Sequence, residues 1–199
     1  MARPREFDEA VVLDAAVHCF WSRGYESTSV KDLVNGTGIT AASLYNAYGD
    51  KLGLFRTALD RYVEHSIAAR LRRCAALPPR EAIDAFFDDI LSRSLNDRQH
   101  KGCMLVNSAL EMAPHDPEFQ QTIAGVLKRL ERFFFDCVEA GQEAGTISRA
   151  LAAEDLARHL LGTLMGVRVL ARARPERPLL EGVVAMALAL LDQPGGKAA

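Results

Sequence analysis

The sequence predicts an all-α protein, and three observations carry this prediction. Apolar residues recur at helical spacing along most of the chain. Glycines and prolines separate these periodic segments from one another. No segment alternates apolar and polar residues convincingly, as a half-buried strand would. With 199 residues, of which 49% are hydrophobic and 25% charged, the chain has the composition of a globular protein with a core of its own.

Composition and terminal sequences exclude several classes of protein. The four cysteines are widely separated and form no C-x-x-C pair, which indicates reduced thiols rather than a disulfide scaffold. The first residues lack the apolar core of a signal peptide, and the longest apolar run, at 179–191, is too short to cross a bilayer. We therefore expect a cytoplasmic protein with no membrane partner. The net charge of −2 does not indicate nucleic-acid binding, so that function must be argued from a local motif.

Four helices are predicted in the first third of the chain. A residue that can cap a helix precedes each periodic segment, and glycine follows each of the first three. The fourth helix is longer, and its buried side carries Leu54, Phe55, Ala58, Leu59, Tyr62 and Val63. In chain order the caps and stops are Asp8, Gly24, Thr28, Gly36-Thr37-Gly38, Thr40, Gly49 and Asp50.

The rest of the chain predicts five further helices, which we expect to form a bundle. Pro78-Pro79 is the first hard break, and a polar stretch at 96–101 and an interruption at 174–176 separate later segments. The expected helices cover residues 80–95, 103–113, 117–144, 153–173 and 176–191.

The segment 28–55 carries the functional signal. A short helix, a glycine-containing turn and a second short helix form a helix-turn-helix, in which Gly36 and Gly38 permit the tight turn. The second helix exposes small or hydrogen-bonding side chains and no long charged one that would block its entry into a major groove. Asparagine can read adenine, and threonine or alanine methyl groups can touch the thymine methyl. Backbone amides at the start of the next helix, together with Lys51, suit a phosphate oxygen.

This segment resembles the TetR family of one-component transcriptional regulators. The resemblance covers about residues 8–60 and rests on three runs, namely Gly24-Tyr25-Glu26-Ser27-Thr28-Ser29-Val30, Gly38-Ile39-Thr40-Ala41-Ala42-Ser43-Leu44-Tyr45 and Tyr48-Gly49-Asp50-Lys51-Leu52-Gly53-Leu54-Phe55. Two places depart from the family pattern. Tyr48 replaces the common phenylalanine, and Leu52 and Gly53 stand where a glutamate often follows the lysine. We expect the second departure to weaken the start of the fourth helix.

The resemblance implies a homodimer whose subunits have about nine helices. Residues 1–55 would form a three-helix DNA-binding domain for a palindromic operator, and residues 56–199 a bundle for ligand binding and dimerisation. The implied function is that of a repressor released by a hydrophobic or thiol-reactive inducer, with no cofactor and no catalytic residue. The alternative is a helical ligand-binding or enzyme-like protein with a vestigial helix-turn-helix. Intact Thr40, Tyr45 and Lys51 argue against that alternative.

Nine residues of the motif are predicted to contact DNA. Side chains early in the second helix should lie nearest the bases, and the tyrosine and lysine that follow should contact phosphates. The expected base-proximal residues are Thr40, Ala42 and Ser43, and the expected phosphate contacts are Tyr45 and Lys51. The full predicted set is Thr28, Thr40, Ala41, Ala42, Ser43, Tyr45, Asn46, Tyr48 and Lys51.

Local charge does not favour DNA binding by itself. Residues 1–56 hold six lysines and arginines against seven aspartates and glutamates. The cations must therefore be placed toward the phosphates and the acids away from them. The cations expected to face DNA are Arg3, Arg5, Lys31 and Lys51.

The last two helices are predicted to form the dimer contact. Both are too apolar for a single buried stripe, and Gly162-x-x-x-Gly166 would allow two helices to approach closely. The alternative is that these glycines serve packing inside one subunit. The predicted interface residues are Leu160, Gly162, Gly166, Val184 and Leu188.

An inducer pocket is expected between this helix pair and the central helices. Its predicted lining is mainly apolar, which favours a hydrophobic ligand. The candidates are Phe86, Ile90, Cys103, Met104, Asn107, Phe134 and Met165. In the run Phe133-Phe134-Phe135, adjacent helical residues point about 100° apart, so at least one ring should line a cavity or subunit contact or pack beneath a loop.

Cys103 is a candidate chemical sensor. It follows Gly102 at the expected start of a helix, and the preceding Lys101 and His100 and the free helical amides would favour its thiolate. Within the resemblance, some relatives carry a reactive cysteine near this place. The alternative is a small buried residue that begins a helix. His100 and Cys103 also form an H-x-x-C pair, but two ligands do not make a metal site, so none is predicted.

Overall fold

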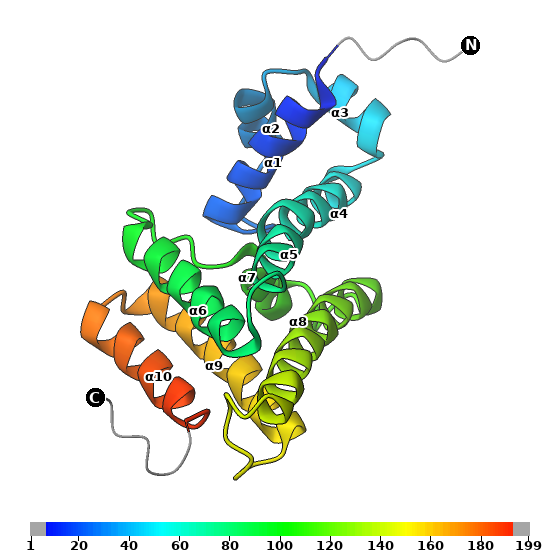
Figure 1. Cartoon of the computed structure of the whole chain (residues 1–199). Coiled ribbons are helices and arrows are strands. Elements are labelled where there is room, and N and C mark those ends of the chain that lie inside the picture. Colours follow the sequence, from blue (N-terminus) through cyan, green and yellow to red (C-terminus); the bar gives the residue numbers. More distant parts are fainter. Residues whose placement is uncertain (1–6, 193–199) are drawn as a thin grey trace. The chain divides into compact units, whose positions relative to one another are not determined.

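The computed structural model describes residues 7–192, and in that range the chain is helical and contains no strand (Figure 1). The predicted all-α class is confirmed. The α-helices are α1 (Glu9–Arg23), α2 (Val30–Thr37), α3 (Ala41–Tyr48), α4 (Lys51–Tyr62), α5 (Ala69–Cys74), α6 (Pro79–Asn96), α7 (Met104–Glu111), α8 (Pro117–Glu143), α9 (Ala153–Ala173) and α10 (Arg177–Ala189). A π-helical segment, η1 (Val63–Ala68), joins α4 to α5 without a break, so the described chain has nine separate helical rods.

The rod formed by α4, η1 and α5 is longer than the sequence analysis predicts. The apolar pattern of the fourth helix extends only to Val63, whereas the rod continues to Cys74 (Figure 1). No glycine or proline lies between Gly53 and Pro78, so no residue of the chain ends the helix earlier. The π-helical turn shifts the helical register in the middle of the rod.

Side-chain caps fix the starts of the first four helices. Asp8, Thr40 and Asp50 accept backbone N–H groups at the starts of α1, α3 and α4, as predicted. The predicted cap of α2 is wrong by one residue. Ser29 accepts the N–H of Asp32, and the Asp32 carboxylate accepts the N–H of Ser29 in return.

The chain divides into two compact units. Unit 1 comprises Met1–Ile67 and Cys103–Gln120, and unit 2 comprises Ala68–Gly102 and Gln121–Ala199. This division differs from the predicted boundary between residues 55 and 56. The difference arises because α4 packs against α1, and α7 packs with both helices in the same unit.

Aromatic rings form the centre of unit 1. The ring of Phe55 on α4 lies 4.9 Å from that of Phe20 on α1 and 5.3 Å from that of Phe119, measured between centroids. Arg61 on α4 donates two hydrogen bonds, of 2.6 and 2.8 Å, to the Asp14 carboxylate on α1. These contacts join α1 to α4 and α4 to the first turn of α8.

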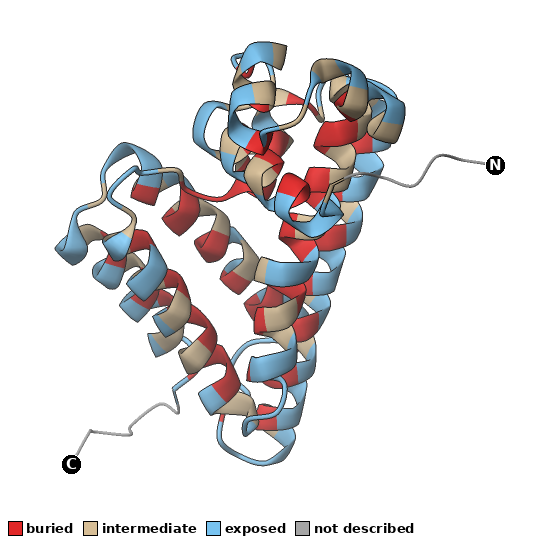
Figure 2. Ribbon diagram, turned by 90° about the horizontal axis from the view of Figure 1, so that it is seen from above, coloured by how far each residue is buried: buried red, intermediate tan, exposed pale blue. Residues whose placement is uncertain are grey.

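A second aromatic cluster forms the core of unit 2. Phe86 and Phe87 on α6 pack against Phe133 and Phe134 on α8, with centroids 5.1–5.7 Å apart. Buried residues, drawn in red, recur along the helices of the chain (Figure 2), and they include Leu160 on α9 and Leu180 on α10. Within the described range, no helix combines the length and the apolar character that crossing a bilayer requires.

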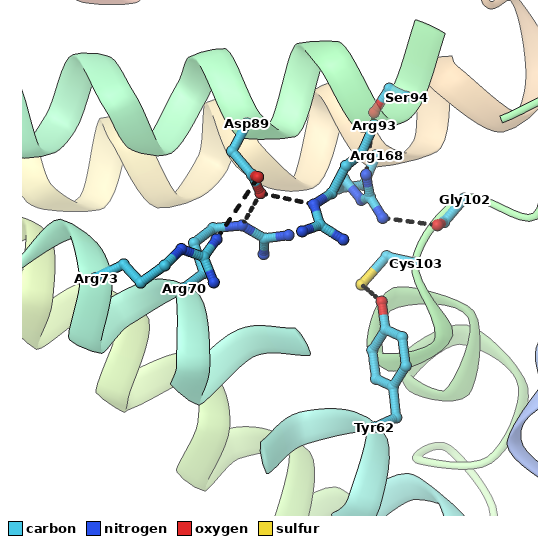
Figure 3. Close-up of polar contacts among 9 residues, drawn as sticks. All are labelled: Tyr62, Arg70, Arg73, Asp89, Arg93, Ser94, Gly102, Cys103 and Arg168. Carbon is cyan, nitrogen blue, oxygen red and sulfur yellow. Dashed lines mark hydrogen bonds and ion pairs between the residues drawn. The ribbon is translucent and has the colours of Figure 1, made fainter. Parts of the chain in front are cut away.

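One carboxylate in unit 2 is shared by three arginines. Arg70 and Arg93 donate hydrogen bonds to Asp89 Oδ2, and Arg73 Nη2 lies 3.6 Å from Asp89 Oδ1 (Figure 3). Burial opposes ionisation of Asp89, but the hydrogen bonds from Arg70 and Arg93 outweigh it and hold its pKa below the ordinary value. The Arg70 guanidinium is itself buried, so the cluster depends on this carboxylate.

Replacing Asp89 by asparagine is expected to lower the free energy of unfolding at pH 7 by about 2 kcal/mol. This value lies between the typical cost of breaking an exposed salt bridge and that of breaking a buried one. Because the folded-state pKa of Asp89 is depressed, its contribution is complete above the unfolded pKa of about 3.9 and is lost as pH falls through the folded value. Urea denaturation of both proteins at pH 7 and in acid checks this. A stability difference that does not shrink in acid would contradict the ionic origin.

Candidate nucleic-acid interface

The turn between α2 and α3 has the tight backbone that a helix-turn-helix needs. Gly38 ends α2 in the left-handed conformation, with φ of 74°, and its N–H donates to the Val34 carbonyl. Thr40 then begins α3 by accepting the N–H of Ser43 at 3.2 Å. Gly36, however, lies inside α2 and not in the turn. A Cβ there would come within 2.5 Å of Cys19 Sγ, so this glycine lets α1 and α2 pack closely.

The solvent-facing side of α3 is made of small or neutral side chains. Leu44 is buried and anchors the helix on unit 1. The helix contains no charged residue, and the Tyr45 side chain is 37% exposed. A helix of this kind can enter a major groove without a charged side chain in its way. Of the predicted DNA-binding residues, the exposed ones are Thr40, Ala42, Tyr45 and Asn46, and the half-buried ones are Ala41, Ser43, Tyr48 and Lys51.

Lys51 stands at the first position of α4, where the first backbone N–H groups lack partners within the helix. Its Nζ lies 4.4 Å from the centroid of the Tyr25 ring and 3.4 Å from the Glu26 carbonyl oxygen. The cation is therefore held beside α3 by the loop between α1 and α2. This arrangement places one positive charge and a helix N-terminus together, as phosphate binding requires.

Gly53 brings α4 against the end of α3. A Cβ at this position would lie 2.1 Å from the Tyr48 carbonyl oxygen, which no side chain can accommodate. The departure from the family pattern at Gly53 thus has a steric reason. The expected weakness at the start of α4 is offset by Asp50, whose Oδ1 accepts the Gly53 N–H at 2.7 Å.

Thr28 is not available to DNA, and its prediction as a contact is wrong. The residue is fully buried, and its Oγ1 donates a 2.5 Å hydrogen bond to the Gly24 carbonyl. This hydrogen bond closes the loop before α2. Of the cations expected to face DNA, Lys31 is exposed on α2, while Arg3 and Arg5 lie outside the described residues.

The predicted pocket residues fall in both units. Cys103, Met104 and Asn107 belong to unit 1, and the remaining four, Phe86, Ile90, Phe134 and Met165, to unit 2. Phe86 and Phe134 are fully buried and pack edge to face at 5.1 Å, so each serves the core of its unit. A single pocket lined by all seven residues stays a prediction.

A cavity in unit 2 is lined by other residues. It has a volume of about 350 Å³ and is formed by α8 and α9. Phe135 lines it while Phe133 and Phe134 are buried, so the prediction that one of the three consecutive rings leaves the core is confirmed. The lining residues are Lys128, Glu131, Arg132, Phe135, Glu154 and Ala157.

Two of the predicted dimer residues are core residues of the subunit. Leu160 and Val184 are buried within the chain itself, so their assignment to an exposed interface is wrong. Leu188 is half-buried. A Cβ at Gly162 or Gly166 would meet no atom within 4 Å, so neither glycine serves close packing inside the described chain.

Sequence reasoning missed one residue that bears on the interface. Glu111, at the end of α7, accepts the N–H groups of Tyr25 and Glu26 beside Lys51. More than eighty residues separate the two segments, and no local motif links them.

Among the described residues, no group of three or more His, Cys, Asp or Glu side chains could hold a metal ion.

Sequence comparison assigns both parts of the chain to known families. Residues 12–58 match the family of bacterial regulatory proteins named after TetR, and residues 79–186 match the tetracyclin repressor-like C-terminal domain. The chain is 33% identical to the HTH-type transcriptional regulator YezE of Bacillus subtilis (strain 168), over 96% of this chain and 100% of YezE. It is 30% identical to the HTH-type transcriptional repressor ComR of Escherichia coli (strain K12), over 85% and 82% of the two chains.

The fold is also similar to solved structures of regulators. A cysteine mutant of the TetR family transcriptional regulator CifR, solved in complex with a 26-base-pair double-stranded operator DNA, superposes with a TM-score of 0.84. The two sequences are 31% identical, and the match covers 96% of this chain and 100% of CifR. A TetR transcriptional regulator from Chloroflexus aurantiacus J-10-fl gives a TM-score of 0.79 at 25% identity, over 91% of both chains.

Proposed function

The chain belongs to the TetR family of bacterial transcriptional regulators, and from that premise we propose that it is a homodimeric repressor. It binds a palindromic operator and is released by a small-molecule inducer. The observation that carries this proposal is the uncharged, exposed face of α3 beside Lys51 at the start of α4. The operator complex of the similar regulator CifR supports it. A cytoplasmic location follows from this role.

We assign the reading of the operator to α3. Ala42 and Asn46, on the exposed side of the helix, face the base edges, with the Thr40 methyl and hydroxyl at its entry. Tyr45 and Lys51 contact phosphates at the edges of the groove that α3 enters. Two copies of α3 in a dimer occupy successive major grooves, with half-sites about one helical turn or a small multiple of it apart.

Two stripes of small and apolar residues support the dimer. On α9, Gly162, Gly166 and Val169 recur at helical spacing, and Val169 is 45% exposed. On α10, Gly182 and Met186 recur in the same way, Leu190 follows at the C-cap of the helix, and Met186 is 70% exposed. A Cβ at any of the three glycines would meet no atom within 4 Å. A second copy of the same two helices fits these stripes as an isologous four-helix contact.

Selection of duplexes from a random DNA library by the full-length protein tests the function. The enriched sequences should contain two inverted half-sites at a fixed spacing. A protein that enriches no sequence, or only sequences without inverted symmetry, would not be this repressor. That outcome would favour the helical ligand-binding or enzyme-like alternative.

Lys51→Ala is expected to weaken binding to all duplexes, whatever their sequence, because the lost contact is to a phosphate. The slope of log affinity against log salt concentration should fall by about one for each phosphate contact removed. Titrations of wild type and variant between low and moderate salt give both quantities. Unchanged affinity in both Lys51→Ala and Tyr45→Ala would contradict the docking proposed for α3 and α4.

Cys103 remains our candidate for a thiol-reactive inducer. It directly precedes α7, is 7% exposed, and its Sγ accepts a 3.4 Å hydrogen bond from the Tyr62 hydroxyl (Figure 3). Tyr62 in turn packs edge to face on Trp21 of α1, with centroids 5.1 Å apart. A bulky adduct on Sγ would displace Tyr62 and disturb this path to α1.

A comparison of wild type with Cys103→Ser checks the sensor. Both proteins should bind operator when reduced, and only the wild type should release it after a mild thiol modifier. Burial raises the pKa of the other three thiols, to about 11 for Cys137, so they are less reactive at neutral pH. Equal release by both proteins would contradict the assignment of Cys103 as the sensor. A hydrophobic inducer that does not react with a thiol would then be the remaining candidate.

A further inference from the structure

A carboxylate from α7 holds two consecutive backbone N–H groups of the loop between α1 and α2. Glu111 is the last residue of α7, and its Oε2 accepts the Tyr25 N–H at 3.0 Å. Its Oε1 accepts the Glu26 N–H at 2.8 Å. All three residues belong to unit 1, although 85 or more positions separate Glu111 from the loop in the sequence.

The loop is shaped to receive this carboxylate. Gly24, which ends α1, has a φ of 86°, and a Cβ there would lie 2.9 Å from Oε2 and 3.1 Å from Oε1 of Glu111. Successive backbone N–H groups that point to one side form a concave anion site. Hydrogen bonds to a carboxylate are also stronger than those between neutral groups. The contact therefore fixes the loop conformation.

The same loop holds the proposed phosphate contact. The Tyr25 ring and the Glu26 carbonyl position the Lys51 ammonium, at 4.4 and 3.4 Å. The loop then leads directly into α2, which Ser29 caps. Displacing the loop would shift the Lys51 ammonium and the first turn of α2 together.

We propose that Glu111 is a positioning residue for operator binding. It touches no DNA and lies within the C-terminal family match at 79–186, outside the DNA-binding match at 12–58. Through Tyr25 and Glu26 it sets the position of Lys51 and thereby the affinity for the operator. This inference rests on the proposed function, since it concerns the affinity of that DNA site.

The test is a double-mutant cycle on operator affinity, measured by fluorescence anisotropy with the selected duplex. The proteins are wild type, Glu111→Gln, Lys51→Ala and the double variant. Glu111→Gln should weaken binding about tenfold, because the glutamine side chain has one accepting oxygen and directs its NH₂ group at the other loop N–H. Since Glu111 acts through Lys51, replacing Glu111 should reduce operator affinity clearly less in the Lys51→Ala protein than in the wild type.

A matched control and a second readout separate positioning from general stability. Glu139→Gln makes the same chemical change at an exposed site on α8 in unit 2 and should leave affinity within twofold of wild type. Hydrogen exchange of the Tyr25 and Glu26 amides should accelerate in Glu111→Gln and stay unchanged in the control. If Glu111→Gln is unfolded at the assay temperature, the cycle uses Glu111→Asp, whose shorter side chain cannot reach both N–H groups.

The outcomes are distinguishable. Non-additive losses with faster amide exchange support the positioning role. Wild-type affinity in Glu111→Gln, or losses that simply add to those of Lys51→Ala, would overturn it while leaving the proposed function intact. Absence of specific binding by the wild type and the Glu139→Gln control would instead refute the proposed function itself.

Discussion

Replacing Gly166 by leucine is expected to give a folded monomer that binds operator about a hundredfold or more weakly than wild type. Nothing in the subunit lies within 4 Å of a Cβ at this position, so the fold can accept the side chain. A partner helix packed on the α9 stripe of Gly162, Gly166 and Val169 would clash with the leucine side chain. A monomer also loses the gain in affinity that a dimer obtains by binding two linked half-sites at once, and this gain is large.

Gly125→Leu is the matched control for this variant. Gly125 lies on the exposed side of α8, and a Cβ there also meets nothing within 4 Å. Analytical ultracentrifugation of both variants decides the matter, with circular dichroism to establish folding. A dimer that survives Gly166→Leu would remove this glycine from the interface, and monomers from Gly125→Leu would point to a different face.

Gly53→Ala is expected to lower the free energy of unfolding by about 1–3 kcal/mol, as overpacking does. It should also weaken operator binding. The added methyl group would lie 2.1 Å from the Tyr48 carbonyl, a backbone atom that cannot rotate away. The start of α4, with Lys51, must therefore move away from α3. Exposed helical glycines behave in the opposite way, because alanine there is favoured by up to about 1 kcal/mol.

Urea denaturation and operator titration of Gly53→Ala and Gly125→Ala check this prediction side by side. The first variant should lose both stability and affinity, while the second keeps its affinity and becomes slightly more stable. If Gly53→Ala gained stability like the control, the close approach of α3 and α4 would not exist in solution.

Local signals in the sequence were sufficient for the helix-turn-helix. The caps at Asp8, Thr40 and Asp50 and the left-handed Gly38 act within a few residues, so their sequence patterns predict them directly. The wrong assignment of the α2 cap to Thr28 is also a local error, of one residue. Thr28 and Ser29 are both good caps, and Ser29 takes the position because Asp32 completes its capping box while the Thr28 hydroxyl donates to Gly24.

Features that depend on tertiary packing could not be predicted in this way. α9 and α10 are apolar on several sides, so the sequence does not say which side faces the core. Leu160 and Val184 face it, and the glycine stripes do not. Glu111 is a further case, because a glutamate at a helix end gives no indication of a loop 85 residues earlier.

Chemical protection of the operator tests the central claim most directly. Dimethyl sulfate methylates guanine N7 in the major groove and adenine N3 in the minor groove, and these atoms lie in different grooves. With the selected operator, the bound protein should protect guanine N7 at two positions related by the operator's symmetry, about one helical turn or a small multiple of it apart. Protection confined to adenine N3, or no protection of either atom, would contradict recognition through α3.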